Sequence, residues 1–162
     1  MNYIAVVEDS AQDRAVLDSY LEKYQQEKNC HFQNTHFSDG DEIALGYKGG
    51  YDLILMDIEM PGMNGLDAAR AVLEQRPECK VIFITAYSLF QYAHEAVHLG
   101  ACDYLLKPVD PDETEAAIRR AIRQIEAGRR LAELAAEAPE PETAPEQETE
   151  PAGEGESARN AL

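Results

Sequence analysis

The chain has no tryptophan, only three cysteines and no long apolar run. Cys30, Cys79 and Cys102 show neither paired nor CxxC spacing, which argues against a disulfide framework and against cysteine-based metal or redox chemistry. No apolar stretch approaches the roughly 20 residues that a membrane span needs, and the N-terminus lacks the basic and apolar segments of a signal peptide. We therefore expect a cytoplasmic protein without a membrane span.

Positive charge is also scarce. The chain has 14 Lys and Arg residues against 31 Asp and Glu residues, so its formal net charge is -17. Residues 131–162 hold nine Glu and one Arg and carry -8, which leaves -9 for residues 1–130. Because both parts are acidic and repel phosphate groups, we expect that this chain alone does not bind nucleic acid.

The last part of the chain lacks large apolar side chains almost entirely. Residues 138–162 are rich in Pro, Glu and Gly and bury too little apolar surface to offset the entropy of ordering. We therefore predict a disordered acidic tail over 138–162. Residues 128–137 keep a helical pattern despite Gly128, which costs about 1 kcal/mol, and are predicted to extend the last helix. A single domain is expected over 1–127.

The first 127 residues alternate between short apolar runs and helical patterns. Buried parallel strands are predicted from the apolar runs at 3–7, 53–56, 81–84 and 104–106, and an edge strand at 31–37. Helices are predicted over 11–25, after the cap Asn64, over 89–99 with Phe90, Ala93 and Val97 in a stripe, and after Pro111. Five β-α alternations predict an α/β fold with a doubly wound, five-stranded parallel sheet and five helices.

Reactive side chains follow the ends of four predicted strands. Glu8-Asp9, Asp57, Thr85 and Lys107 each close or directly follow an apolar run. Since the carboxyl ends of parallel strands open on one edge of the sheet, these side chains should meet there. Three carboxylates repel one another unless a cation joins them, and Mg²⁺ suits a few carboxylates plus a phosphate. The sequence therefore predicts a divalent-metal and phosphoryl-transfer site.

At these positions the chain resembles the receiver domains of bacterial two-component response regulators. The resemblance rests on the acidic pair, on the string from Asp57 to Gly65 with Pro61 in place, on Thr85, and on Lys107-Pro108. It covers about residues 1–127 and implies a flavodoxin-like sheet with strand order 2-1-3-4-5.

The resemblance also implies roles for individual residues. Asp57 would be the phosphoacceptor, and Mg²⁺ would be held by Asp9 and Asp57, by Glu8 through water, and by the backbone carbonyl of Glu59. Thr85 and Lys107 would contact the phosphoryl group as a hydroxyl donor and a point charge.

Two further implications concern the shape of the site and its switching. A cis Lys107-Pro108 bond would aim the ammonium inward. Tyr104 would be a switch aromatic that turns inward when Thr85 moves.

Lys107 lies 22 residues after Thr85, and together with the Phe-x-Tyr-Ala-x-Glu-Ala string at 90–96 this spacing makes the chain most similar to receivers that precede AraC-type output domains, with LytTR-type outputs as a second candidate. Only a helix and an acidic tail follow here, so a single-domain response regulator is expected: a signalling domain rather than an enzyme. Its donor would be a sensor histidine kinase or a histidine phosphotransferase. It would signal by binding another protein or a second copy through the face formed within 89–125. A phosphorelay shuttle or phosphate sink is the alternative.

A competing motif lies in the fourth helical segment. His94, Glu95 and His98 fit H-E-x-x-H, the zinc-protease pattern in which two histidines bind the metal and the glutamate acts as base. Glu113 or Glu115 is a candidate third ligand. Because residues 87–108 resemble receivers throughout, we keep a zinc metalloprotease only as a remote alternative.

Overall fold

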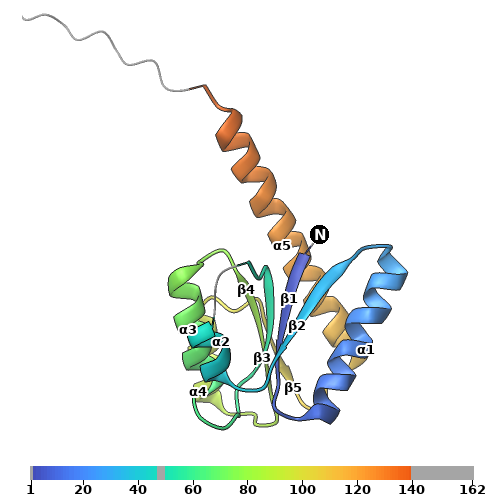
Figure 1. Ribbon diagram of the computed structural model, residues 1–162, viewed down its shortest axis with the longest axis vertical. Helices are drawn as coiled ribbons and strands as arrows, with labels where there is room; N and C mark the ends of the chain where they lie inside the picture. Colours follow the sequence, from blue (N-terminus) through green and yellow to red (C-terminus); the bar gives the residue numbers. More distant parts are fainter. Residues whose placement is uncertain (1, 47–49, 140–162) are drawn as a thin grey trace, which may run out of the picture.

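The computed structural model describes residues 2–46 and 50–139 (Figure 1). The tail predicted over 138–162 therefore lies, from residue 140 onward, outside the described residues. The strands are β1 (Asn2–Val7), β2 (Phe32–Phe37), β3 (Leu53–Asp57), β4 (Lys80–Thr85) and β5 (Asp103–Leu106). The helices are α1 (Ala11–Lys28), α2 (Gly40–Gly46), α3 (Gly65–Gln75), α4 (Phe90–His98) and α5 (Pro111–Glu137).

The strands form one parallel sheet in the order β2-β1-β3-β4-β5, which confirms the expected doubly wound topology. The edge position predicted for 31–37 is also confirmed, because β2 pairs only with β1 among the described strands. Val7 is in register with Met56, and Asp57 with Ile84. This register brings the carboxyl ends of β1, β3 and β4 to the same edge of the sheet.

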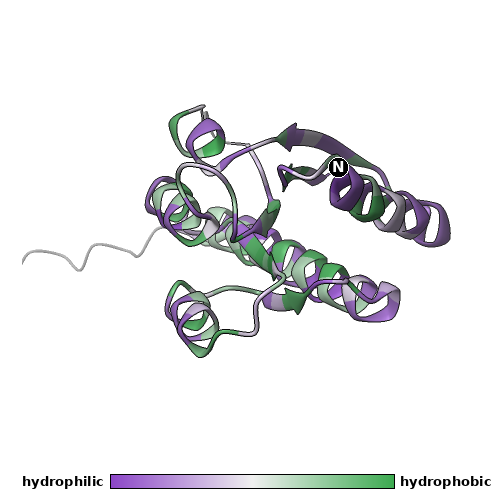
Figure 2. Cartoon of the chain, turned by 90° about the horizontal axis from the view of Figure 1, so that it is seen from below, coloured by the Kyte–Doolittle hydropathy of each residue, from purple (hydrophilic) through white to green (hydrophobic). Residues whose placement is uncertain are grey.

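Helices cover both faces of the sheet. α1 and α5 lie on one face, and α2, α3 and α4 lie on the other (Figure 1). Alternate residues of β3 point to opposite layers: Leu53 and Leu55 pack toward α1 and α5, while Ile54 and Met56 pack toward α3. In Figure 2, seen from below, the sheet lies between two layers of helices that mix hydrophilic and hydrophobic residues. Burial on both faces explains the continuous apolar runs.

One expectation about burial is wrong. The run 104–106 was predicted as a buried strand, but β5 is the outer strand next to β4, and Leu106 is 43% exposed. The helix predicted over 89–99 is present, and two residues of its stripe are exposed, Phe90 to 82% and Val97 to 78%, whereas Ala93 is half-buried. Among its residues only Ala96 is fully buried. Helical periodicity gives the spacing of a stripe but does not determine what covers it.

The last helix continues without a break from Pro111 to Glu137, through Gly128. Its first turn is capped by the Asp110 side chain, which accepts hydrogen bonds from two backbone N–H groups. Ala117, Ile118, Ala121, Ile122 and Ile125 are buried, as the predicted stripe requires. Beyond them the helix projects past the amino-terminal edge of the sheet (Figure 1).

The hydropathy of the helices and the state of the cysteines test two further expectations from the sequence. Among the described residues, no helix combines the length and the apolar character needed to cross a bilayer. The three cysteines are free thiols, and burial raises the pKa of Cys79 to about 12. A buried thiol of this kind carries little thiolate at neutral pH and is therefore a weak nucleophile.

Candidate functional site

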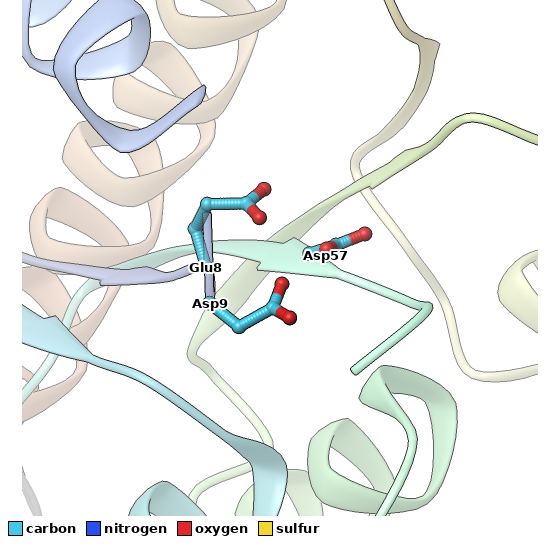
Figure 3. A group of neighbouring side chains, drawn as sticks. All are labelled: Glu8, Asp9 and Asp57. Carbon is cyan, nitrogen blue, oxygen red and sulfur yellow. The ribbon is translucent and has the colours of Figure 1, made fainter. Parts of the chain in front are cut away.

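The carboxyl ends of β1 and β3 bring three carboxylates together. Oxygen atoms of Glu8, Asp9 and Asp57 all lie within 4.8 Å of one another, and the three side chains converge on one space (Figure 3). Glu8 and Asp57 are buried, with 0% and 3% exposure, whereas Asp9 is exposed. The strand-end pattern therefore brought together the three acidic side chains that it predicted.

Glycines allow the loop after β3 to close tightly around Asp57. A Cβ on Gly65 would lie 2.1 Å from the Asp57 carbonyl oxygen, so only glycine fits where α3 begins beside β3. The Gly65 N–H donates to the Ile58 carbonyl at 2.9 Å, and Asn64 caps α3, as predicted, by accepting from the Asp67 N–H at 3.0 Å. Pro61 lies exposed within the same loop. These contacts hold Asp57 at a fixed point of the rim.

Lys107 reaches the same space from the end of β5. Its Nζ lies 2.8 Å from Glu8 Oε2, 3.0 Å from Asp13 Oδ2 and 3.3 Å from Asp57 Oδ2. The Lys107-Pro108 bond is cis, as the resemblance implied, and the Lys107 N–H donates to the Thr85 carbonyl at 2.7 Å. One ammonium therefore serves three carboxylates.

The charge balance of the site shifts its pKa values. Burial raises the pKa of Glu8 to about 7, against the opposing effect of the Lys107 hydrogen bond. Burial also raises the pKa of Asp57, against the charge of Lys107. Burial alone would lower the pKa of Lys107, but its bonds to Glu8 and Asp13 raise it. The carboxylates thus lack sufficient positive charge, and an added cation would stabilise their ionised forms.

The donor set fits a hard divalent cation. Mg²⁺ prefers oxygen ligands, and in an octahedron with bonds of about 2.0–2.1 Å neighbouring ligand oxygens lie about 3 Å apart and opposite ones about 4 Å apart. The cluster of Glu8, Asp9 and Asp57 has this chemistry, and its oxygens span a comparable distance. Glu59 lies two residues further on, and its backbone N–H donates to Asp57 Oδ1 at 3.3 Å. The structure therefore places all four residues expected to hold Mg²⁺ in one neighbourhood.

Thr85 and Tyr104 belong to one chain of hydrogen bonds. The Thr85 hydroxyl is buried at the end of β4 and accepts from the Tyr87 N–H at 3.1 Å. The Tyr87 carbonyl in turn accepts from the Tyr104 hydroxyl at 3.2 Å. The site is thereby connected through two residues to the outer strand β5.

Sequence reasoning missed Asp13, which is the third partner of Lys107. Asp13 lies in the first turn of α1, where its N–H donates to the Ser10 side chain and an acidic residue is an ordinary finding. One signal was present: Asp13 follows Asp9 by four residues, so a helix beginning here directs it toward the same rim. Its contact with Lys107, 94 residues away, depends on the fold.

The H-E-x-x-H motif lies on the exposed side of α4. The Nε2 atoms of His94 and His98 are 3.1 Å apart, and Glu95 lies 3.9 Å from an Arg70 guanidinium nitrogen. Within the described ranges, the residues that gather as three possible metal ligands are Glu8, Asp9 and Asp57, and neither histidine is among them. The geometry therefore does not support a zinc metalloprotease site at His94, Glu95 and His98.

The doubly wound parallel sheet, with acidic residues and a lysine at its carboxyl edge, places the chain in the class of flavodoxin-like α/β domains. The family model described as the response regulator receiver domain matches residues 4–119. The chain belongs to the response regulator receiver family.

Named relatives agree with this assignment. The chain is 39% identical over 119 residues to the DNA-binding transcriptional regulator NtrC of Salmonella typhimurium, covering 72% of this chain and 24% of that protein. It is 32% identical over 122 residues to the transcriptional regulatory protein ResD of Bacillus subtilis, covering 75% of this chain and 48% of that protein. The chain thus spans less than half the length of these relatives.

Solved structures show the same fold. A CheY-like receiver domain protein from Methanospirillum hungatei superposes with a TM-score of 0.66 at 26% identity, covering 79% of this chain and 98% of that one. A structure described as the BeF3-activated DrrB receiver domain gives a TM-score of 0.62 at 26% identity, covering 76% of this chain and 98% of that one. The similarity therefore extends over nearly the whole of these receiver domains.

Proposed function

We propose that this chain accepts a phosphoryl group on Asp57 from a sensor histidine kinase or a histidine phosphotransferase, with Mg²⁺, and signals through phosphorylation-dependent protein binding. The observation that carries the proposal is the Asp57 carboxylate itself. It is held at the strand end by the Glu59 N–H, is paired with Lys107 at 3.3 Å, and lies in a carboxylate cluster that requires a cation.

Phosphoryl transfer uses these groups in defined roles. An Asp57 oxygen attacks phosphorus, the new O–P bond forms as the donor's N–P bond breaks, and the freed imidazole takes up a proton. Lys107 and Thr85 supply an ammonium and a hydroxyl to the phosphoryl oxygens, where charge develops. Water later breaks the O–P bond, which restores the carboxylate and releases inorganic phosphate. Each role requires only a small movement of side chains already at the rim.

Residues Glu8, Asp9 and Asp57, with the Glu59 carbonyl, are the proposed Mg²⁺ ligands. When bound, the ion neutralises the clustered carboxylates and polarises the phosphoryl oxygens. Glu8 and Asp57 have raised pKa values, so a cation would restore the ionised form that nucleophilic attack requires.

Intact-mass analysis after incubation with a small acyl phosphate tests the proposed function. The wild-type protein should gain one phosphoryl group when Mg²⁺ is present and none when it is chelated. Asp57→Asn should not be labelled, whereas Asp67→Asn, an exposed acid on α3, should be labelled normally. Equal labelling of wild type and Asp57→Asn would exclude Asp57 as the acceptor.

The proposed output surface comprises 89–99, 103–107 and 112–125. Exposed apolar side chains gather there, and Phe90, Val97 and Leu106 are 82%, 78% and 43% exposed. If the Thr85 hydroxyl turns toward a phosphoryl group, its bond from the Tyr87 N–H is lost, and the Tyr87 carbonyl that holds Tyr104 is displaced. A charge added at Asp57 is thereby coupled to the packing of Tyr104.

Hydrogen exchange with and without beryllofluoride and Mg²⁺ tests this coupling. Exchange should change mainly within 85–107, and Tyr104→Phe, which lacks only the hydroxyl, should reduce that change while labelling of Asp57 stays intact. A mimic that binds without changing exchange there would favour the second candidate, a phosphorelay shuttle or phosphate sink.

The remaining parts of the proposal concern organisation. We assign 1–127 to the receiver and 128–137 to a helical extension, which would link the receiver to whatever lies beyond it. A cytoplasmic location follows from a cytoplasmic phosphodonor. The net charge of -17 favours a protein partner over nucleic acid for this chain, while the relative named as DNA-binding is about four times as long as the matched region.

A further inference from the structure

Asp13 is a charged neighbour of the phosphorylation site that the family motif does not include. Its Oδ2 lies 3.0 Å from Lys107 Nζ, and its side chain is 45% exposed. The other two partners of this ammonium, Glu8 and Asp57, are 0% and 3% exposed. Asp13 is therefore the outermost and the most easily displaced of the three.

The Lys107 ammonium is shared among three carboxylates. It donates hydrogen bonds to Asp13 and Asp57, and it lies 2.8 Å from Glu8 Oε2. A phosphoryl group on Asp57 needs one of these bonds, since Lys107 is the only cation within ion-pair distance of Asp57 in the described part of the chain. Asp13 competes with the phosphoryl oxygens for this ammonium, and as the most exposed of its three partners it is the one that we expect to give way when Lys107 turns toward them.

The surroundings leave room for this movement. Asp13, Lys107 and Pro108 line a cavity of about 230 Å³ between α1 and the segment after β5. Tyr20 and Val109 line the same cavity, and the Tyr20 hydroxyl donates to the Val109 carbonyl at 3.2 Å. This second bond keeps α1 beside the segment after β5 when the Asp13 contact is removed, so substitution of Asp13 should leave the fold intact.

We propose that Asp13 is a positioning residue that acts through Lys107 and disfavours the phosphorylated state. The inference rests on the proposed function. Asp13 holds the ammonium away from the phosphoryl position, and its own negative charge repels the incoming anion. Both effects raise the concentration of anionic donor needed for labelling and shorten the lifetime of the bound phosphoryl group.

The test compares Asp13→Asn with wild type, using beryllofluoride and Mg²⁺ in titration calorimetry. A unit charge about 6 Å from the bound anion, in a partly exposed site, changes the dissociation constant about three- to tenfold. Asp13→Asn should therefore bind beryllofluoride more tightly by that factor. The half-saturating acyl phosphate concentration should fall similarly, while the maximal labelling rate changes little.

Asp18→Asn is the matched control on the same helix. Asp18 is also partly exposed, but it pairs with His36 at 2.8 Å rather than with Lys107. Equal tightening in both variants would assign the effect to net charge and overturn the proposal. Unchanged or weaker binding in Asp13→Asn would also overturn it, since weaker binding would mean that Asp13 holds Lys107 in its productive position.

A second readout does not depend on phosphorylation. Acylation of the Lys107 amine, followed by peptide mass spectrometry, should be faster in Asp13→Asn because the amine loses the outermost of its three carboxylate partners, to which it donates at 3.0 Å. Wild-type protein that neither binds beryllofluoride nor accepts phosphate would refute the proposed function itself. Wild-type labelling together with an unaltered Asp13→Asn variant would refute only the role of Asp13.

Discussion

The two ends of β3 each carry a buried aspartate, and the two are balanced in opposite ways. Asp57, at the carboxyl end, shares one ammonium with Glu8 and Asp13. Asp52, directly before the strand, is 5% exposed and receives two guanidinium groups, from Arg76 at 3.2 Å and from Arg129 at 2.9 Å. It also accepts from the Tyr3 N–H at 2.8 Å.

This difference separates a reactive site from a structural anchor. A carboxylate that pairs with two guanidinium groups holds elements together, here β1, α5 and the segment between α3 and β4. Asp57, which shares a single ammonium with two other carboxylates, has too little positive charge around it and can be stabilised by an added cation. Burial alone does not distinguish the two aspartates, because both are almost fully covered.

The largest effect on stability is expected at the structural anchor, which is Asp52 with Arg76 and Arg129. Asp52→Asn should lower the free energy of unfolding by about 2 kcal/mol, because a buried carboxylate loses charge-assisted bonds to two arginines. Labelling of Asp57 should persist. Urea denaturation without metal measures the first and intact mass the second. Asp57→Asn is the comparison variant and should be as stable as wild type or more so; an equal loss in both variants would remove the distinction.

Magnesium should stabilise the folded protein only by binding at the reactive end of β3, where Glu8, Asp9 and Asp57 lie. At about ten times its dissociation constant, a ligand of the native state adds about 1.4 kcal/mol to the free energy of unfolding. The free energy of unfolding should increase by the same amount in wild type and Asp52→Asn when Mg²⁺ is added, and by much less in Asp57→Asn. Thermal melting with Mg²⁺ or with chelator measures this. A full gain in Asp57→Asn would place the ion elsewhere.

The reactive end should also make stability depend on pH when metal is absent. The pKa of Glu8 rises from 4.5 to about 7 on folding, so the folded protein binds this proton more tightly. The resulting stability is present at low pH and is lost as pH rises through about 7, by about 1 kcal/mol between pH 6 and 8. Melting in chelator across that interval should show the loss, and Glu8→Gln should flatten it. A wild-type profile without slope would contradict the raised pKa.

The smallest effect on stability should come from substitution of Arg129, the more exposed of the two arginines that pair with Asp52. Arg129 is 45% exposed and also donates to the Asn2 side chain at 2.8 Å. Because solvent screens such a pair, Arg129→Gln should cost about 0.5–1 kcal/mol. Hydrogen exchange should accelerate in α5 beyond Ile125 and remain unchanged at the rim around Asp57. Faster exchange at both ends of the sheet would show that the two are coupled.

The sequence by itself determined the strands, their order through the family resemblance, and most of the rim. Apolar runs buried on both faces mark parallel strands, and parallel strands gather whatever follows them at one edge. Glu8, Asp9, Asp57, Thr85 and Lys107 could therefore be named before any coordinates. Their roles in binding Mg²⁺ and phosphate stay predictions that the experiments above test.

Only the tertiary structure decided which contacts join distant segments. Asp13 reaches Lys107 across 94 residues, and Arg129 reaches Asp52 across 77, as no local pattern could reveal. The same holds for α4, where Ala96 is buried against the core while Phe90 and Val97 are exposed, and no element of the described structure covers these two side chains. Periodicity records which side chains share a face, whereas packing decides whether that face meets the core, a partner or water.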